Sequence, residues 1–423
     1  MIISMVRIAA TVMSAVALVA CGPAPVSTVP PPSSLAPVSA APETPNPTST
    51  PGSSASAAPS SVAVREWRPA AQMLRARTGF DAVVLGDGSV LAVGDDFACY
   101  PGPAVAGSER AERYDPVKDV WMEAPSLNKP RKEPATVVLS DGSALVIGGL
   151  NDVEQPFSST KRFATGTGEW ADGPLMNLGR VLPLGVTLPD GAVFVVSETD
   201  GRFTSELMDQ AAGSWRTTAS LPAQTRIDDI VSLRGGTVLA VGTYEGDSDP
   251  TPDAHRYDPV AGMWMDAHGL AQFGYALVAM PDGGALAVGG SDGGELWGGT
   301  GALTSRVHRF DPPTGTWRQV ASLSTPRWEP QVVVLVDGRV LVAGGSTGDA
   351  TTGHALRSTE LYDPATDRWV PGPDLIEPRY GGHALALSDG SVLILGGAKD
   401  FNTEGDTPWC PTPLGTTERL AAP

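Results

Sequence analysis

The sequence predicts an all-β fold in which one four-stranded unit is repeated along most of the chain. Three observations predict it. The 423-residue chain contains 49 Gly and 39 Pro and is poor in helix-forming blocks of Lys, Glu and Leu, which favours a turn-rich β protein. An Asp-Gly pair recurs between two apolar runs at a period of about fifty residues, which indicates an internal repeat. A Trp separates most of these repeats from the next one.

The first twenty residues have the pattern of a secretory signal. Arg7 is their only charged residue, and the apolar run over residues 8–19 is too short to span a bilayer. The run leads into LVACG (residues 18–22), which resembles a bacterial lipobox. The resemblance implies that residues 1–20 are a lipoprotein signal peptide and that Cys21 becomes the lipidated first residue of the mature chain. An ordinary cleaved signal followed by a chance Cys is the alternative.

Residues 21–63 form a low-complexity segment of Pro, Ser, Ala and Thr with a single acidic residue, Glu43. Such a composition cannot bury a core, so we expect a disordered linker. With the signal, it predicts an extracytoplasmic protein that is lipid-anchored to the bacterial cell membrane or outer membrane. The folded domain, residues 64–423, would sit at the end of this tether.

Each repeat begins with a hairpin. The Asp-Gly pair lies between two apolar runs, as in VVLGDGSVLAVG, and because Asp-Gly accepts positive φ we expect a two-residue turn. The second run usually ends in glycine, where the missing side chain lets backbones pack closely. The turns start at Asp87, Asp141, Asp190, Gly235, Asp282, Asp337 and Asp389.

A second hairpin completes the repeat. Its turn reads Tyr-Asp-Pro at Tyr114, Tyr257 and Tyr362 and Phe-Asp-Pro at Phe310. A Trp follows, and we expect this large side chain to pack between neighbouring units. These tryptophans are Trp121, Trp170, Trp215, Trp264, Trp317 and Trp369. Four strands joined by tight hairpins describe one blade of a β-propeller.

The pattern Arg…Asp-Gly…Gly-Gly…Tyr-Asp-Pro…Trp resembles the kelch repeat, and the resemblance covers nearly all of residues 64–423. It implies a kelch-type β-propeller, and the seven turns predict seven blades. The last unit ends at TTERLAAP without a Trp, whereas VREWRP, before the first unit, supplies Trp67. We therefore expect the N-terminal strand to complete the last blade and close the ring, which removes free sheet edges.

Two further cysteines, Cys99 and Cys410, fall in corresponding loops of the first and last repeats. Those blades are neighbours in a closed ring, and an extracytoplasmic setting permits a disulfide. We predict a Cys99–Cys410 disulfide that clamps the ring. Two unpaired buried thiols are the alternative.

An Arg recurs ten positions before most of the turn aspartates. By strand order it lies on the face that also holds the loops between second and third strands. These side chains could grip an anionic ligand, and Arg327 and Arg379 are kept as candidates for that role. The favoured interpretation is structural, because an Arg is common here in kelch repeats and can bond loop carbonyls and nearby acids. The slot holds Arg77, Arg131, Arg180, Arg226, Gln272, Arg327 and Arg379.

Aromatic residues follow this slot only in units five to seven, as Phe273, Trp328 and Tyr380. Trp297 and Trp409 fall in the second-to-third-strand loops of units five and seven. The three tryptophans Trp297, Trp328 and Trp409 are expected to cluster on one side of one face, and such aromatics could stack on a sugar ring or grip a peptide. Packing beneath long loops is the alternative.

Three polar residues lie four positions beyond the Arg slot in units that are consecutive around a closed ring: Asp81, Gln331 and His383. The first strand of a blade faces the central channel, so we expect these side chains to line it, and we include them among the candidate ligand-binding residues. A hydrogen-bonded structural role is the alternative.

Charge and motifs narrow the function. The net charge of −18 argues against nucleic-acid binding. Galactose oxidase uses a seven-bladed kelch propeller, but its copper-binding tyrosines and histidines do not map onto this chain, and we predict no metal or cofactor. Acidic loops leave calcium open. The predicted function is a surface-exposed, monomeric, non-catalytic recognition module for a glycan or protein ligand. A carbohydrate-active enzyme of the galactose oxidase-like class, using the channel mouth, is the alternative.

Overall fold

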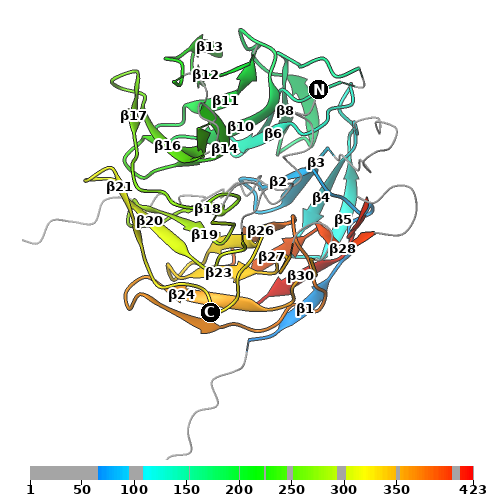
Figure 1. The fold of residues 1–423 in the computed structure, drawn as a ribbon. Coiled ribbons are helices and arrows are strands. Elements are labelled where there is room, and N and C mark those ends of the chain that lie inside the picture. The colour runs from blue at the N-terminus through cyan, green and yellow to red at the C-terminus, as the bar shows by residue number, and fades with distance from the viewer. Residues whose placement is uncertain are drawn as a thin grey trace, which may run out of the picture. The chain divides into compact units, whose positions relative to one another are not determined.

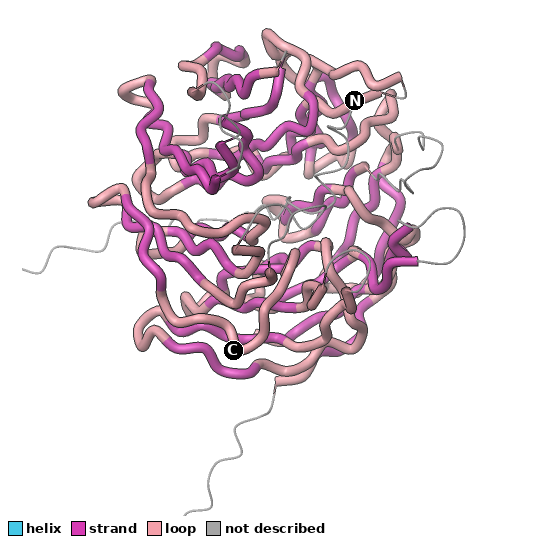
Figure 2. The backbone as a smooth tube through the Cα atoms, viewed as in Figure 1, coloured by secondary structure: helices cyan, strands magenta, loops and turns pink. Residues whose placement is uncertain are grey.

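The described residues of a computed structural model form seven four-stranded antiparallel sheets and one two-stranded sheet (Figures 1 and 2). No helix occurs among these residues, so the all-β prediction is confirmed. The structure describes residues 65–94, 108–151, 153–199, 201–222, 225–244, 251–292, 302–348, 353–402 and 410–422. Within them, no helix is long and apolar enough to cross a membrane.

Six of the sheets, blades 1 to 6, take their four strands in sequence order. Blades 1 to 3 consist of β2 (Asp81–Val84), β3 (Val90–Val93), β4 (Ala111–Asp115), β5 (Val120–Ala124); β6 (Ala135–Val138), β7 (Ala144–Ile147), β8 (Thr160–Ala164), β9 (Glu169–Asp172); and β10 (Val181–Thr187), β11 (Val193–Thr199), β12 (Arg202–Asp209), β13 (Ser214–Thr217). Blades 4 to 6 consist of β14 (Thr225–Ser232), β15 (Val238–Tyr244), β16 (Thr251–Asp258), β17 (Met263–Asp266); β18 (Ala276–Ala279), β19 (Ala285–Val288), β20 (Val307–Asp311), β21 (Thr316–Gln319); and β22 (Gln331–Val334), β23 (Val340–Ala343), β24 (Thr359–Asp363), β25 (Arg368–Pro371).

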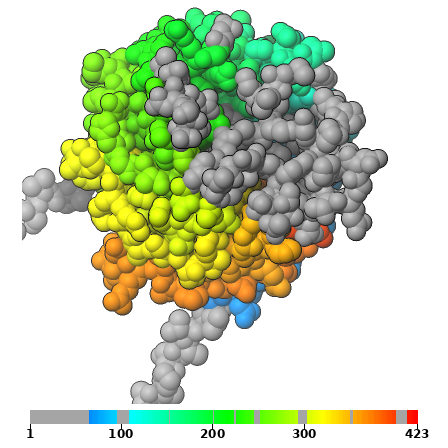
Figure 3. Space-filling model, in the orientation of Figure 1, coloured from blue at the N-terminus to red at the C-terminus, as the bar shows by residue number. Residues whose placement is uncertain are grey.

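Blade 7 combines the two ends of the folded chain. Its strands, from the inside outward, are β26 (His383–Ala386), β27 (Val392–Leu395), β30 (Thr417–Leu420) and β1 (Trp67–Ala70). Trp67 of β1 faces Leu420 of β30 in register. In Figure 3 the blue surface near the start of the described chain accordingly borders the orange surface of later residues. The prediction that the N-terminal strand completes the last blade is confirmed.

The first strands of the blades form a closed ring. Each contacts the first strand of the next blade, and β26 of blade 7 also contacts β2 of blade 1. This arrangement confirms the seven-bladed β-propeller. Each blade therefore presents its first strand to the common axis and its fourth strand to the periphery.

The hydrophobic core is divided among the interfaces between blades. Strand β23 of blade 6 is an example. Its sequence is apolar throughout because all four of its side chains are completely buried. Val340 and Val342 pack toward blade 5, whereas Leu341 and Ala343 pack toward blade 7. A strand covered on both faces needs a continuous apolar run instead of an alternating one.

The repeat Trp closes the outer end of these interfaces. Trp215 of blade 3 is 7% exposed and packs in the cluster shared with blade 2. Its indole N–H donates to the backbone oxygen of Pro174, in the crossover that enters its own blade, at 3.2 Å. Trp67 makes the equivalent bond to Pro373 O at 3.0 Å. The expectation that these side chains pack between blades is confirmed.

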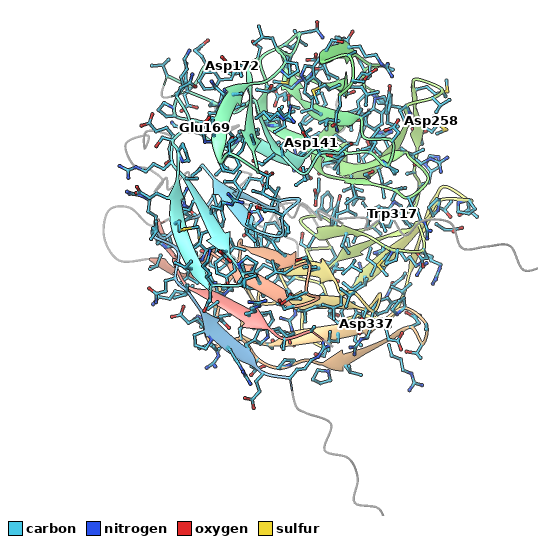
Figure 4. All side chains as sticks on the ribbon, turned by 180° about the vertical axis from the view of Figure 1, so that it is seen from behind. Asp141, Glu169, Asp172, Asp258, Trp317 and Asp337 are labelled. Carbon is cyan, nitrogen blue, oxygen red and sulfur yellow. The ribbon has the colours of Figure 1, made fainter. Side chains whose placement is uncertain are left out.

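The first hairpin of a blade turns over three residues, not two. In blade 6, Gly338 N donates to Leu335 O and Leu335 N donates to Arg339 O. Only the glycine has a positive φ, 84°, while Asp337 Oδ1 accepts the Arg339 N–H at 3.1 Å (Asp337 is labelled in Figure 4). The expectation of a two-residue turn is wrong because the glycine takes the left-handed bulge position that follows a tight turn.

The predictions for the cysteines fall outside the described structure. Residues 1–64, including Cys21, and the loop that contains Cys99 lie outside the described residues. Cys410 begins β29 (Cys410–Pro413), which pairs with β28 (Ala398–Asn402), but its side chain is not described. Lipidation and the disulfide therefore stay predictions.

Candidate ligand-binding site on the crossover face

One face of the propeller carries the segments that cross from a fourth strand to the next first strand. The residue after the Arg slot on such a segment pairs with the loop that leaves the second strand of the same blade, as Trp328 does with Ser346 and Tyr380 with Ala398. Crossover segments and second-to-third-strand loops therefore share this face, as the sequence predicts. We call it the crossover face.

The arginines of the slot that recurs from blade to blade are buried beneath the crossover face. Arg327 is completely buried. Its Nη1 donates to Gly344 O and Ser358 O, both at 2.8 Å, and its Nη2 donates to Glu360 Oε1 at 3.0 Å. Five members are at most 1% exposed: Arg77, Arg131, Arg180, Arg327 and Arg379.

A Glu on the third strand neutralises the Arg in four blades. Glu206 illustrates its second role, since its carboxylate also accepts the backbone N–H groups of Asn177 and Leu178 in the crossover. Buried charges that are paired and hydrogen-bonded in this way need no ligand. The pairs are Arg77–Glu112, Arg180–Glu206, Arg327–Glu360 and Arg379–Glu418, with N–O distances of 2.7 to 3.0 Å.

Arg327 and Arg379 are therefore no longer counted among the candidate ligand-binding residues. Both side chains are completely buried, and the Nη1 and Nη2 groups of both donate to carbonyls, hydroxyls and a carboxylate of the same blade. This is a correction to the ligand-binding interpretation, and it supports the structural role of the slot. The physical reason is that the Arg joins the crossover, the second strand and the third strand of one blade.

Blades 2 and 5 replace the Arg–Glu pair by other chemistry. In blade 5, His308 Nδ1 and Gln272 Oε1 lie 2.8 Å apart. In blade 2, Lys161 takes the place of the acid and pairs with Asp172, at the end of β9 (labelled in Figure 4). Arg131 consequently keeps no buried counter-ion, and burial lowers its pKa to about 10.

Asp81 and His383 join neighbouring inner strands. His383 Nε2 donates to Phe80 O of blade 1 at 2.9 Å, and Asp81 Oδ2 accepts the N–H of Thr136 in blade 2 at 2.5 Å. Both side chains are at most 5% exposed. Burial lowers the pKa of His383 to about 4 and raises that of Asp81 to about 7, because each charged form is costly inside the protein.

Gln331 makes the third such contact. Its side-chain amide donates to Ala343 O and accepts the N–H of Gly382 in blade 7, both at 3.0 Å. Gln331, His383 and Asp81 thus connect blades 6, 7, 1 and 2 in order. The expectation that these side chains line an open channel is corrected: they are buried, and their polar atoms are used between blades.

The aromatic candidates separate into buried and accessible side chains. Phe273 is 7% exposed and Tyr380 is 1% exposed, so both are packing residues in this structure. Trp328 is partly exposed. Trp297 and Trp409 lie outside the described residues. Of the described candidates, Trp328 is the aromatic that can offer a ring to a ligand.

The ring of Trp328 lies over the crossover of blade 5. A Cβ atom at Gly274 would collide with this ring, so glycine is required there. The indole N–H donates to Glu329 Oε1 at 2.6 Å. Glycine at one side and a carboxyl at the other therefore hold the ring in place at the junction of blades 5 and 6.

Glu329 adjoins the candidate site, and it was not singled out from the sequence. It has φ 51°, the left-handed region that non-glycine residues avoid. The same position is left-handed in six crossovers, where it is occupied by Gly79, Glu133, Leu182, Gly274, Glu329 and Gly381. The sequence signal that could have singled it out is a Glu at the repeat position where blades 5 and 7 have Gly274 and Gly381.

The carboxyl of Glu329 is buried and only half satisfied. The residue is 8% exposed, and Oε2 has no hydrogen-bond partner. Burial raises the pKa of this carboxyl to about 8, while the bond from Trp328 opposes the rise. At neutral pH the side chain is therefore mostly a neutral carboxylic acid.

Comparison with known proteins identifies the repeat. Residues 274–324 and 330–376 match the Kelch motif. The two matched ranges correspond to blades 5 and 6 of the propeller. The chain is 28% identical over 200 residues to a human kelch repeat and BTB domain-containing protein, a match that covers 46% of this chain and 40% of that protein.

Other relatives also match part of the chain. An F-box/kelch-repeat protein of Arabidopsis thaliana is 31% identical over 133 residues, covering 31% of this chain and 33% of that protein. Galactose oxidase of Gibberella zeae is 26% identical over 202 residues, covering 44% of this chain and 28% of that protein. The kelch-repeat chain thus spans well under half of each of these relatives.

A solved structure shares the fold. A fungal alcohol oxidase of the AA5 family, determined in complex with copper, superposes with a TM-score of 0.64 and 22% sequence identity. The match covers 85% of this chain and 77% of that chain. At this identity the propeller fold is what the two have in common.

The copper of that structure raises the question whether the residues of this kelch propeller fit a metal. Among the described residues, no three His, Cys, Asp or Glu side chains converge as metal ligands. His383 is hydrogen-bonded to Phe80 O and His308 to the side chain of Gln272, and the two histidines lie in different blades. The donors that the structure describes do not fit a copper site, and no step through copper is derived.

Proposed function

We propose that this kelch propeller is a non-catalytic recognition module that binds a protein partner through the crossover face at blades 5 to 7. The observation that carries the proposal is Trp328, a partly exposed indole that departs from the repeat and is held in place by Gly274 and Glu329. Kelch-repeat propellers typically serve protein interaction. A large aromatic ring fixed at a surface is the kind of side chain on which binding energy concentrates.

The rest of the site supports recognition over catalysis. Arg327, Gln331 and His383 surround the crossover but are buried and committed to bonds within the protein. A reaction needs groups that reach a substrate, whereas docking needs a rigid surface with a few exposed anchors. The interlocked crossovers of blades 5 to 7 supply that surface.

Substitution of Trp328 tests the proposal. Ligands of the full chain would be sought in arrays of extracytoplasmic proteins and of glycans, and each hit compared with Trp328→Ala. We expect protein hits whose affinity falls at least tenfold, because loss of a central aromatic anchor costs about 2 kcal/mol or more. Val260→Ala, an exposed side chain in an outer turn of blade 4, should leave binding unchanged.

Other outcomes would change the assignment. Binding to glycans alone would move the ligand class to carbohydrate. Unchanged binding of every hit by Trp328→Ala would remove this face as the site. Bound copper together with oxidation of simple alcohols or sugars by the purified chain would overturn the non-catalytic role.

We also propose that the chain is a monomeric, extracytoplasmic lipoprotein anchored through Cys21, with a Cys99–Cys410 disulfide across the ring closure. The supporting observations are the lipobox-like sequence and the contact between blades 7 and 1. Cys21→Ser should move the protein from the detergent phase to the aqueous phase on Triton X-114 partition. Non-reducing peptide mass spectrometry should show Cys99 and Cys410 linked, and free thiols at both would sink the disulfide.

A further inference from the structure

The carboxyl of Glu329 is incomplete as a hydrogen-bonding group. Oε1 accepts the indole N–H of Trp328, whereas Oε2 is enclosed without a partner. Nearly all buried polar groups in native proteins are satisfied, so an orphan carboxyl oxygen calls for an explanation. Glu360, in contrast, accepts from both Arg327 and the crossover N–H of Ser324.

The backbone of Glu329 is also strained. Blades 5 and 7 place Gly274 and Gly381 at the equivalent left-handed position. A side chain in this conformation costs about 1 to 2 kcal/mol, and a glycine would avoid that cost. Glu133 and Leu182 share this conformation, so the strain belongs to the repeat position, and the enclosed, unpartnered carboxyl is what sets Glu329 apart.

Among the described residues, no charged side chain balances Glu329. The causes that shift its pKa are burial, which raises it, and the Trp328 hydrogen bond, which lowers it. The neighbouring guanidinium of Arg327 is turned to Glu360 and to loop carbonyls. Within the described residues, the positive partner of this carboxyl is therefore missing.

We propose that Glu329 and Trp328 together bind a cationic group, an ammonium or guanidinium that a ligand presents to the crossover face. The carboxylate supplies the counter-charge through Oε2, and the indole supplies a cation–π surface. The net charge of −18 attracts such a ligand over a distance. The inference rests on the proposed function, because it names the chemistry recognised at the same site.

Binding is coupled to a proton. Because Oε2 is enclosed in this structure, the side chain has to turn outward past the indole edge to meet the cation. The bound carboxylate must be ionised, so a proton leaves the protein for the cation that arrives. With a free pKa of about 8, about 0.9 proton should be released per ligand at pH 7.

The direct test follows the indole of Trp328 by NMR in the full chain. Ten indole signals are expected from ten Trp, and Trp328→Phe assigns one of them. The probes are acetyl-Gly-Arg-Gly-amide, the same peptide with neutral citrulline in place of Arg, and 1-butylguanidine. We expect both guanidinium probes to shift the Trp328 signal and the citrulline peptide to leave it unmoved.

The variants isolate the carboxyl. Glu329→Gln keeps the shape of the side chain but loses the charge, so binding should fall at least tenfold while the other indole signals stay in place. Glu133→Gln, at the equivalent left-handed position of blade 2, is the matched control and should bind as wild type. Equal shifts with citrulline, or binding that survives Glu329→Gln, would overturn the proposal.

Titration calorimetry in buffers of different ionisation enthalpy gives the proton count. We expect the dissociation constant to fall nearly tenfold from pH 6 to pH 7 and to level off above about pH 8. Affinity that is independent of pH, with no proton released, would contradict the role of Glu329. Tighter binding of the Arg peptide than of 1-butylguanidine indicates a protein side chain as the source, and equal binding indicates a small organic cation.

The two proposals fail separately. If Trp328→Ala abolishes binding of a partner but no cation moves the Trp328 signal, the cationic chemistry is wrong and the recognition surface stands. If the probes bind through Glu329 but every partner binds Trp328→Ala normally, the site takes a small cation and the proposed partner surface is wrong.

Discussion

Adjacent residues on the crossover differ in burial and in hydrogen bonding because one occupies a recurring repeat position and the other does not. Arg327 belongs to a slot filled in most blades, and it is buried and paired with Glu360. Trp328 has no counterpart in blades 1 to 4, and it is partly exposed. Recurrence at a fixed repeat position therefore marks structure, and departure from the repeat marks the candidate for function.

His383 gives a prediction for stability in acid. Its pKa in the folded protein is about 4, below the ordinary value of 6.5. Its contribution to stability is present above pH 6.5 and is lost as the pH falls toward 4. In that range the imidazole is protonated in the unfolded chain but stays neutral in the folded chain. The loss approaches about 1.4 kcal/mol per pH unit within that window.

His383→Gln should remove this slope, since Gln331 already fills the same slot in blade 6 and can donate there. Urea unfolding at pH 7, 5.5 and 4.5 measures it, with His268→Gln, an exposed His, as the control. If wild type and His383→Gln lose stability in parallel over this range, the buried-neutral interpretation is wrong.

At the scale of the element, the Arg–Glu pair holds a crossover to the strands that it enters. Arg180 Nη2 lies 2.7 Å from Glu206 Oε1, and both side chains are completely buried. The same Glu caps two N–H groups of the incoming segment. One charge pair thus ties a crossover to its blade, and the pair recurs in four blades.

Glu206→Ala should destabilise the protein by about 3 kcal/mol or more, because it leaves a buried guanidinium without its counter-ion. Glu123→Ala is the control: Glu123 is 72% exposed and lies 3.8 Å from Arg110, so its loss should cost about 0.5 kcal/mol or less. Chemical unfolding followed by tryptophan fluorescence compares the two. Equal effects would show that the buried pair has no special weight.

At the scale of the whole molecule, stability depends on closing the ring. Blade 7 takes its outermost strand from the N-terminal end of the folded chain, so the first and last strands of the propeller are held in one sheet. Closure covers the edge of β30 and buries Trp67 between blades 6 and 7. Every interface between blades is then occupied on both sides.

Trp67→Ala should lower the free energy of unfolding by about 3 to 5 kcal/mol, since it empties a buried aromatic position at the closure. Arg68→Ala, an exposed neighbour on the same strand, should change it by about 0.5 kcal/mol or less. Urea unfolding followed by circular dichroism gives both values. A small effect of Trp67→Ala would mean that the ring is held closed without β1.

The period of the sequence determined the architecture. Hairpin signals and a tryptophan recurred often enough to predict the blades, their number and the strand that closes the ring, because each repeat must bury its apolar faces on its neighbours. The site was predicted only in part. The sequence singled out Trp328, which stays a candidate, whereas Arg327, Gln331 and His383 were assigned an accessibility that burial removes.

Two things were decided only by the tertiary structure. One is which polar groups are satisfied: an Arg and a Glu far apart in sequence become partners only when the strands are placed. The other is the state of Glu329, which depends on its backbone conformation, on the indole beside it and on the absence of a positive partner among the described residues. A repeat fixes where each residue stands, but burial and hydrogen bonding, which set the chemistry of a side chain, arise from contacts between repeats.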